Sequence, residues 1–454
     1  MRFKSGKIQL PVAILTACSL LIGLLALLWA YFPKLFANTL ATPYPYALHL
    51  ANYQQMLRHM PQYLCVWSAC LAFMAFALAS KKGTRSGSRR ALFELTPLTE
   101  MFLFVVLLAI AAWFSWREWL WWQRPGWDNY WRAGEILHHS LRIGGAEVLP
   151  YLQSFLVKYP HSPSPLTPIA IALLMFVHAD SILILQWLNL AATLGSLIVL
   201  KVISRRLAPS VPFWPVGLLF CTNAAVMRNA FFIQLDAINA FFVVAFFWLW
   251  LRWRDDPGPK RFAALVACLV LGVFQKTTLF PLMAIPTLIE IRDAIGNRRI
   301  NFRRLVIVAT GTAIVPVMLF ALYCFGLGIY QNFGTQLSLM GTGWNELDYS
   351  FWRFFHSTLI VLGALLPVMV FNKEILKSQY LAPALFIVLF FLSIAIAKGP
   401  FWARYYGHVA GPCLILCLPV LAAVNEKASL RRPVLTYVFC AAMLGYWTMY
   451  LHLM

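Results

Sequence analysis

Residues 234–252 read QLDAINAFFVVAFFWLWLR, a largely apolar run with one acidic residue, Asp236, near its start and a basic one, Arg252, at its end. A helix of about 20 such residues crosses the hydrocarbon core of a bilayer. The composition of the whole chain is similarly apolar, because 61% of its 454 residues are hydrophobic and only 12% are charged. Soluble domains carry about a quarter charged residues. The sequence therefore predicts an all-α integral membrane protein with many spans.

Apolar runs of this kind predict about thirteen transmembrane helices. They cover residues 10–32, 61–80, 93–116, 182–203, 212–228, 234–253, 261–275, 278–292, 304–326, 356–371, 379–397, 407–424 and 433–453. The two shortest runs, 261–275 and 278–292, can instead form a bent or broken pair. The first run has no small-residue cleavage site, so we expect a retained helix and not a removed signal peptide.

The basic residues predict how these helices are oriented. If the N-terminus is cytoplasmic and the spans alternate, most of the 37 Lys and Arg residues fall in inside segments. Cytoplasmic loops of membrane proteins carry such an excess. The formal net charge of +21 therefore indicates membrane orientation and not nucleic-acid binding. We expect a two-helix extension in residues 1–90, ending in the basic linker KKGTRSGSRR, and a main membrane domain in residues 91–454 without a soluble part.

The longest polar interruption is residues 124–168, RPGWDNYWRAGEILHHSLRIGGAEVLPYLQSFLVKYPHSPSPLTP. It places Asp128 shortly after the third predicted span, on the outer side. The apolar piece 166–177, which begins at the end of this stretch, is too short to span. It also lies between two segments that must both be outside if later loops are to stay positive inside. We therefore expect a helix that lies along, or dips into, the outer surface.

Several charged residues fall at the predicted outer edge of the membrane: Asp128, Asp236, Lys276, Lys398 and Arg404. Charged groups at membrane depth are costly and usually face a cavity or a partner, so each is a functional candidate. Lys and Arg can neutralise the phosphate of a lipid-linked substrate, and a carboxylate can remove the proton of an attacking hydroxyl. This combination favours sugar transfer from a polyprenyl phosphate. No Cys or His spacing typical of a metal site is present, so we expect no metal or other cofactor.

Residues 127 to about 286 resemble the membrane-embedded C-type glycosyltransferases (GT-C) that use polyprenyl-phosphate sugars. These include the lipid A aminoarabinose transferase, its protein mannosyltransferase kin and bacterial polyprenyl-phosphomannose-dependent mannosyltransferases. The stretches that carry the resemblance are WDNYWRAGEIL, KYPHSPSPLTPIAIALL, QLDAINAFFVVAFFWLWLR and LGVFQKTTLFPLMAIP, followed later in the chain by ARYYGHVAGP. The first stretch is similar to the family's Asp after a transmembrane helix, and the second to its Pro-rich surface element. The third is similar to a helix start with the pattern Gln-x-Asp/Asn-Ala. The fourth is similar to a segment in which a Gly, a Lys and a Pro follow at fixed spacing, and the last to a helix start that contains Arg-Tyr.

The resemblance implies a role for each matching residue. Asp128 would be the catalytic base, Asp236 a supporting carboxylate, and Lys276 and Arg404 the ligands of the donor phosphate. The remaining substrate-binding candidates are Tyr159, His161, Arg228, Lys398 and Tyr405. It also implies a bacterial inner-membrane enzyme with a site facing the periplasm, a polyprenyl-phosphate sugar as donor, and a glycan, lipid or protein acceptor. Many relatives carry an Asp-Glu or a Glu-Lys pair where this chain has Asp128-Asn129 and Pro160-His161. The chain therefore departs from these relatives at positions that concern binding of the acceptor.

Simpler interpretations stand beside these. Asp128 and Asp236 can each cap a helix, Lys276 can extend its ammonium to the lipid headgroups, and Arg404 can bind anionic lipid. A lipid-linked glycan transporter or flippase, or a glycan ligase or polymerase, is an alternative function. Transporters tend to show repeated halves and charges near the bilayer midplane. The chain shows no repeat, and its candidate charges gather on one face.

Overall fold

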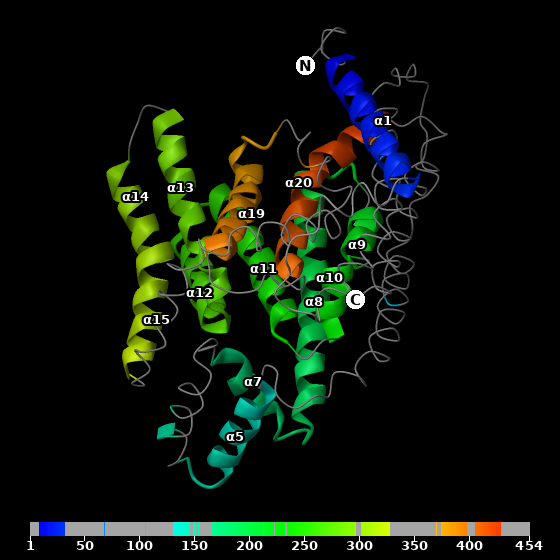
Figure 1. Cartoon of the computed structure of the whole chain (residues 1–454). Helices are drawn as coiled ribbons and strands as arrows, with labels where there is room; N and C mark the ends of the chain where they lie inside the picture. The colour runs from blue at the N-terminus through cyan, green and yellow to red at the C-terminus, as the bar shows by residue number, and fades with distance from the viewer. Residues whose placement is uncertain are drawn as a thin grey trace.

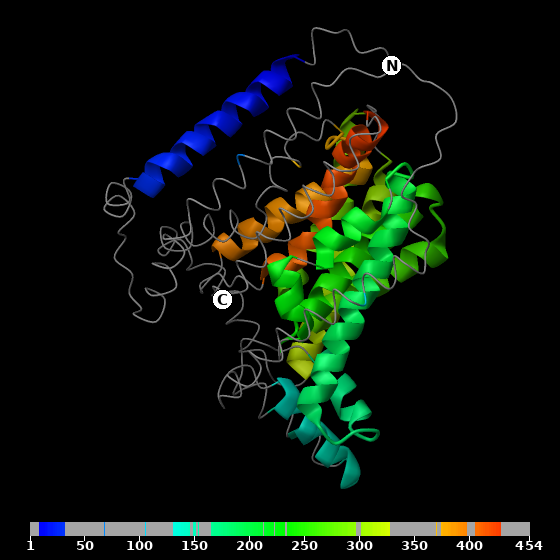
Figure 2. The same cartoon turned by 90° about the vertical axis from the view of Figure 1, so that its right-hand side faces the viewer.

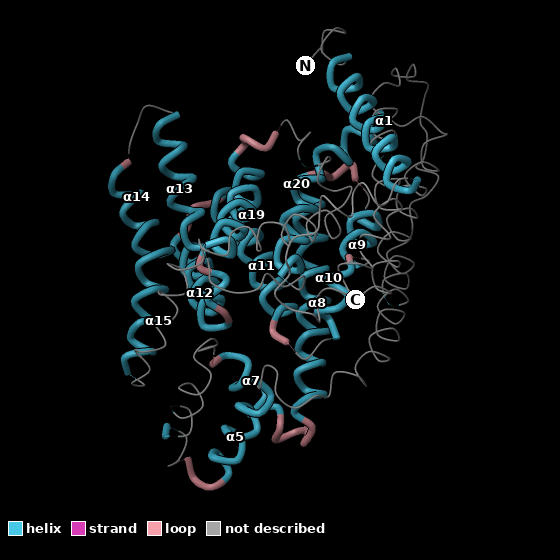
Figure 3. Tube along the Cα trace, in the orientation of Figure 1, coloured by secondary structure: helices cyan, strands magenta, loops and turns pink. Residues whose placement is uncertain are grey.

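The computed structural model describes residues 9–31, 68, 105, 130–145, 149–150, 153, 165–211, 213–221, 223–231, 234–296, 301–326, 369, 374–396 and 405–427. Within these residues every regular element is helical (Figure 3), which confirms the all-α class. Three of the described helices are long and apolar enough to cross a membrane: α8 (Ser181–Leu207), α11 (Asp236–Asp255) and the continuous helix Phe302–Gly326. The number thirteen stays a prediction.

The described helices follow most of the predicted runs. Besides α8 and α11 they are α1 (Gln9–Tyr31), α12 (Pro259–Gln275), α13 (Pro281–Gly296), α14 (Phe302–Ala309), α15 (Val315–Gly326), α19 (Ser378–Ile396) and α20 (Tyr406–Lys427). A π-helical turn, Thr310–Ile314, joins α14 to α15 without interrupting the helix. The runs expected at 61–80, 93–116, 356–371 and 433–453 lie outside the described residues apart from single positions, as does the linker that divides residues 1–90 from the rest.

One predicted span is interrupted, and whether its two halves together cross the membrane stays a prediction. Residues 212–228 do not form a single helix, because α9 (Phe213–Cys221) ends and α10 (Ala224–Phe231) begins three positions later. Asn223 starts the second helix, since its side-chain oxygen accepts hydrogen bonds from the backbone amides two and three residues ahead, at 3.1 and 3.3 Å. This is the bonding pattern of an N-cap. The chain therefore turns within an apolar run that hydropathy alone assigns to one helix.

α11 lies at the centre of the bundle (Figure 1), where it packs against α8, α12 and α20. Its bulky side chains Phe246, Phe247 and Trp250 are buried. Because a helix rises about 1.5 Å per residue, its 20 residues extend roughly 30 Å, the thickness of a bilayer core. The two ends of α11 therefore mark the two ends of the bundle.

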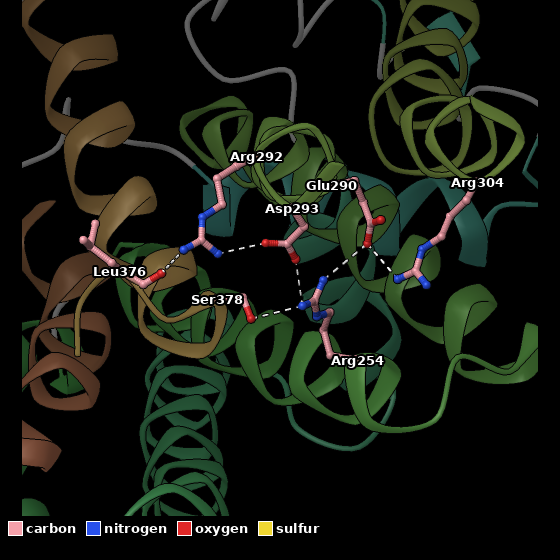
Figure 4. A network of polar contacts seen from close by, with 7 residues as sticks. All are labelled: Arg254, Glu290, Arg292, Asp293, Arg304, Leu376 and Ser378. Carbon is pink, nitrogen blue, oxygen red and sulfur yellow. Dashed lines mark hydrogen bonds and ion pairs between the residues drawn. The ribbon is translucent and has the colours of Figure 1, made fainter. Parts of the chain in front are cut away.

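A charged cluster joins four helices at the C-terminal end of α11 (Figure 4). The Arg254 guanidinium lies 3.4 Å from Glu290 and 2.9 Å from Asp293, both on α13, and donates to the Ser378 hydroxyl at the start of α19 at 3.0 Å. Arg304 of α14 contacts the same Glu290 at 2.8 Å. These residues lie in or at the edges of the loops predicted to be cytoplasmic, and the structure brings them to one end of the bundle. Which compartment this end faces stays a prediction.

Two short helices, α5 (Tyr130–Arg142) and α7 (Leu166–Leu174), lie at the opposite end of the bundle beside the start of α8 (Figures 1 and 2). They pack closely, because a Cβ added to Gly134 would lie 2.4 Å from Cγ2 of Ile171. The Ser181 hydroxyl donates to Glu135 at 2.7 Å and ties α5 to α8. The short helix expected at residues 166–177 is thus present, and it ends at Leu174, while its place at the outer membrane surface stays a prediction.

Candidate functional site

Asp236 is the first residue of α11 and is only 1% exposed. The N-cap position belongs to Leu235, and no side-chain cap bond forms there, so the N-cap interpretation of Asp236 is wrong. Its Oδ1 atom instead contacts two groups on other segments, Nε2 of His408 at 3.0 Å and Nζ of Lys276 at 3.5 Å. A buried carboxylate needs such partners, because its desolvation is otherwise very costly.

Lys276 is placed by the turn that ends α12. Its backbone is extended, with φ −164° and ψ 136°, and the short 3-10 turn η2 (Thr277–Leu279) follows before α13 begins. The side chain is 12% exposed, and its ammonium lies 5.4 Å from the centroid of the Tyr405 ring as well as near Asp236. A snorkelling lysine would direct its ammonium to the headgroups. This ammonium points into the protein, so the snorkelling interpretation is wrong.

His408 and Tyr405 come from the start of α20. His408 is fully buried, and its ring packs edge-on against Phe390 of α19 at 5.3 Å. Its Nε2 atom also lies 3.4 Å from the side-chain nitrogen of Asn239, one turn along α11 from Asp236. The histidine therefore reaches the carboxylate from a largely apolar wall. No prediction from the sequence singled out His408.

Two glycines explain how α20 comes so close to its neighbours. A Cβ on Gly407 would lie 2.4 Å from Nδ2 of Asn229 on α10, and one on Gly411 would lie 2.5 Å from a methyl group of Val244 on α11. Small residues four positions apart let helices in membranes approach closely. The spacing GHVAG at residues 407–411 is a signal for this contact, and it contains His408. It could have pointed to the histidine from the sequence.

Hydrogen bonds between neutral polar groups position the segments that carry Asp236 and Lys276. The Thr167 hydroxyl of α7 donates to Oε1 of Gln275 at 2.9 Å, and both side chains are buried. Gln275 directly precedes Lys276. On the other side, Nδ2 of Asn189 on α8 donates to the backbone oxygen of Gln234 at 2.7 Å, two residues before Asp236. α7 and α8 thus each position one of the two charged residues, Lys276 and Asp236.

We define the site as Asp236, Lys276, Tyr405 and His408. The site holds one carboxylate, one ammonium and one imidazole. Its net charge is zero when the imidazole is neutral and +1 when the imidazole is protonated. An ammonium has three N–H donors, so Lys276 can bind an anionic oxygen of a ligand in addition to Asp236. Within the described parts of the chain no three His, Cys, Asp or Glu side chains gather to hold a metal ion.

A small cavity lies behind the site, between α8, α10, α11 and α20. Its volume is about 10 Å³, and polar side chains of Thr193, Ser196 and Asn229 line it together with Gly407. A space of this size holds about one water molecule and no sugar.

The structure brings together Asp236, Lys276 and Tyr405, which the sequence predicted from three separate segments. The other predicted site residues lie outside the described residues: Asp128, Tyr159, His161, Lys398 and Arg404. Arg228 is part of α10, but its side chain is likewise outside them. Their roles stay predictions. Comparison of the chain with protein-family models, curated proteins and solved structures finds no match.

Proposed function

We propose that the chain is a membrane glycosyltransferase of the C type that transfers a sugar from a polyprenyl phosphate to an acceptor on the outer face of a bacterial inner membrane. About thirteen spans with a cytoplasmic N-terminus would place the site on that face. The observation that carries the proposal is the contact of Asp236 with Lys276 and His408, which are 40 and 172 positions away in the chain. Charged groups are rarely gathered inside an apolar bundle without a function.

The charge of the reaction suits the site. A polyprenyl-phosphate sugar is a phosphodiester with one negative charge, and the polyprenyl phosphate that leaves gains negative charge as the bond breaks. A cation near that phosphate therefore stabilises the transition state more than the ground state, which is what raises the rate. Lys276 is such a cation, with Arg404 as its proposed partner. Tyr405 holds the ammonium from its ring face, an arrangement that keeps N–H donors for the phosphate.

The proposed step is a single nucleophilic displacement at the anomeric carbon of the sugar. The acceptor hydroxyl attacks the anomeric carbon, and the bond from that carbon to the phosphate oxygen breaks. The phosphate leaves with the bonding electron pair, and the hydroxyl proton moves to the Asp128 carboxylate. Asp236 orients Lys276, while Lys398, Tyr159, His161 and Arg228 would bind the rest of the donor or the acceptor. Basic side chains take the place of a metal or other cofactor in this scheme.

Reconstitution of the purified protein with polyprenyl-phosphate sugars and cell-envelope glycan, lipid or peptide acceptors tests the proposal. Mass spectrometry should detect an acceptor heavier by one sugar residue. Asp128→Asn should abolish this product and Lys276→Met should lower its rate at least about 100-fold, while Lys260→Met, a change of an exposed lysine at the other end of the bundle, should leave it unchanged. Normal turnover by Asp128→Asn would show that the proton is removed by another group.

The burial of the site favours one second candidate, a transporter or flippase of a lipid-linked glycan. Intramembrane carboxylates, histidines and lysines that pair with one another also form proton relays in transporters, and Asp236 and His408 are both fully enclosed. A fluorescent lipid-linked glycan in proteoliposomes separates the two functions. A transporter moves the lipid between leaflets without changing its mass, whereas a transferase, ligase or polymerase forms a new covalent product.

A further inference from the structure

The end of α7 and the turn after it carry apolar side chains that are largely exposed, although one side of the Phe176 ring contacts the His138 ring of α5 at 4.5 Å. Phe176 is 60% exposed and Val177 is 85% exposed, and Leu173 and Leu174 beside them are also exposed. These four residues are called the apolar tip. The other side of the same helix is buried, because Ile171 packs against α5 and the start of α8. One edge of α7 thus belongs to the protein core and the other faces outward.

The apolar tip continues the outward face of α8, a candidate membrane span. Trp187, Leu194, Ile198 and Val202 are exposed on that helix, at spacings of seven, four and four residues that place them on one face. The His178 ring, next to the tip, contacts the Trp187 ring edge-on at 5.1 Å. Trp is enriched where a membrane meets water. The tip therefore lies beside the first residue of an exposed apolar stripe on a candidate membrane span.

We propose that the apolar tip inserts among the acyl chains of the leaflet that α8 enters, and that α7 transmits this anchorage to the site through the hydrogen bond from Thr167 to Gln275. Amphipathic helices at such interfaces bury their apolar edge about 5–10 Å below the headgroups. The continuity with α8 selects bilayer lipid as the occupant over a second protein. This interaction does not depend on the transferase reaction.

The link from the tip to the lysine is short. α7 is one helix of nine residues that begins at Leu166, so Thr167 lies in its first turn and the tip at its other end. Thr167 bonds Gln275, and the backbone amide of the next residue, Lys276, still donates to the Gly272 oxygen at 2.9 Å. A shift of α7 would therefore move or loosen the last turn of α12 and the turn after it.

Photo-cross-linking tests where the tip lies. Benzoylphenylalanine at position 177, in protein reconstituted into phosphatidylcholine nanodiscs, should form adducts with acyl chains that mass spectrometry of the peptide detects. The same group at Ile198, 64% exposed in the middle of α8, is the positive control, and at exposed Lys260 the negative one. A yield at position 177 as low as that at position 260, or an adduct with a second chain in place of lipid, would overturn the insertion.

Hydrogen exchange tests the coupling. In nanodiscs, Val177→Asp and Thr167→Val should each raise amide exchange in residues 273–281 several-fold, with little change in the centre of α11. Thr193→Val is the matched control, since that buried threonine bonds within its own helix, α8, to the Asn189 oxygen at 2.9 Å. Unchanged exchange in residues 273–281 for Val177→Asp would show that the tip does not act on the lysine turn. Neither measurement needs a substrate, so its failure leaves the transferase proposal standing.

Discussion

The interaction between Asp236 and Lys276 predicts a large coupling free energy. Oδ1 and Nζ are 3.5 Å apart, and the two side chains are 1% and 12% exposed. At an effective dielectric constant of about 20, Coulomb's law gives an attraction of roughly 4–5 kcal/mol at this distance. Desolvation of both ions reduces the net value. We expect a coupling of about 2–4 kcal/mol in the free energy of unfolding.

A double-mutant cycle measures this coupling directly. It uses Asp236→Asn, Lys276→Met and the double variant, with unfolding free energies from denaturant titration in mixed micelles. The cycle removes the separate effect of losing the His408 contact, because that loss occurs in both variants that carry Asp236→Asn. Both single variants should be destabilised, and the double variant should be more stable than the sum of the two changes predicts.

An exposed ion pair of the same chain is the control. Arg261 and Asp256 lie 2.8 Å apart, closer than the buried pair, but their side chains are 37% and 68% exposed. Such surface pairs contribute roughly 0.2–1 kcal/mol. If the buried pair couples no more strongly than this control, then Asp236 and Lys276 are not held together as a buried pair, and the account of the site is refuted.

Three further variants test other parts of the structure. Gly407→Ala places a methyl group against Asn229, so it should destabilise the protein by about 1–3 kcal/mol and lower transfer; unchanged unfolding and transfer would contradict the close approach of α20. Arg254→Met leaves Glu290 with Arg304 alone and should cost about 3 kcal/mol with intact kcat in the folded fraction, and a specific loss of kcat would place that cluster in the site. His408→Leu removes the 3.0 Å contact of Nε2 with Asp236 and should lower transfer, and unchanged transfer in the folded fraction would show that the imidazole does not support the carboxylate.

Charge position explains which parts of the site the sequence predicted. Asp236 and Lys276 stand out because each is an ionisable residue at the edge of an apolar run, where burial must be compensated. Alternation of the spans then puts both at the same end of the bundle, as the structure does. The short helix α7 was predictable for a similar reason, since its apolar run is too short to span and follows several prolines.

Contacts between neutral groups explain what the sequence did not predict. His408 lies inside the predicted span 407–424, where it adds no formal charge to the count. Thr167 and Gln275 are 108 positions apart, and nothing local to either residue indicates the other. The break before α10 was missed because the flanking residues are apolar, and one capping side chain, Asn223, decides it. Hydropathy reports burial in lipid and carries no information on such pairings.

Sugar transfer by the purified protein is the most direct test of the central claim. Wild type and Lys276→Met, reconstituted in liposomes with a set of polyprenyl-phosphate sugars and envelope acceptors, are compared by mass spectrometry of the products. We predict an acceptor heavier by one sugar residue with wild type, and a rate lower by at least about 100-fold with Lys276→Met, the loss typical when one group that stabilises transition-state charge is removed. Product formed equally fast by both proteins, or donor lipid moved across the membrane with no product from either, would contradict the claim.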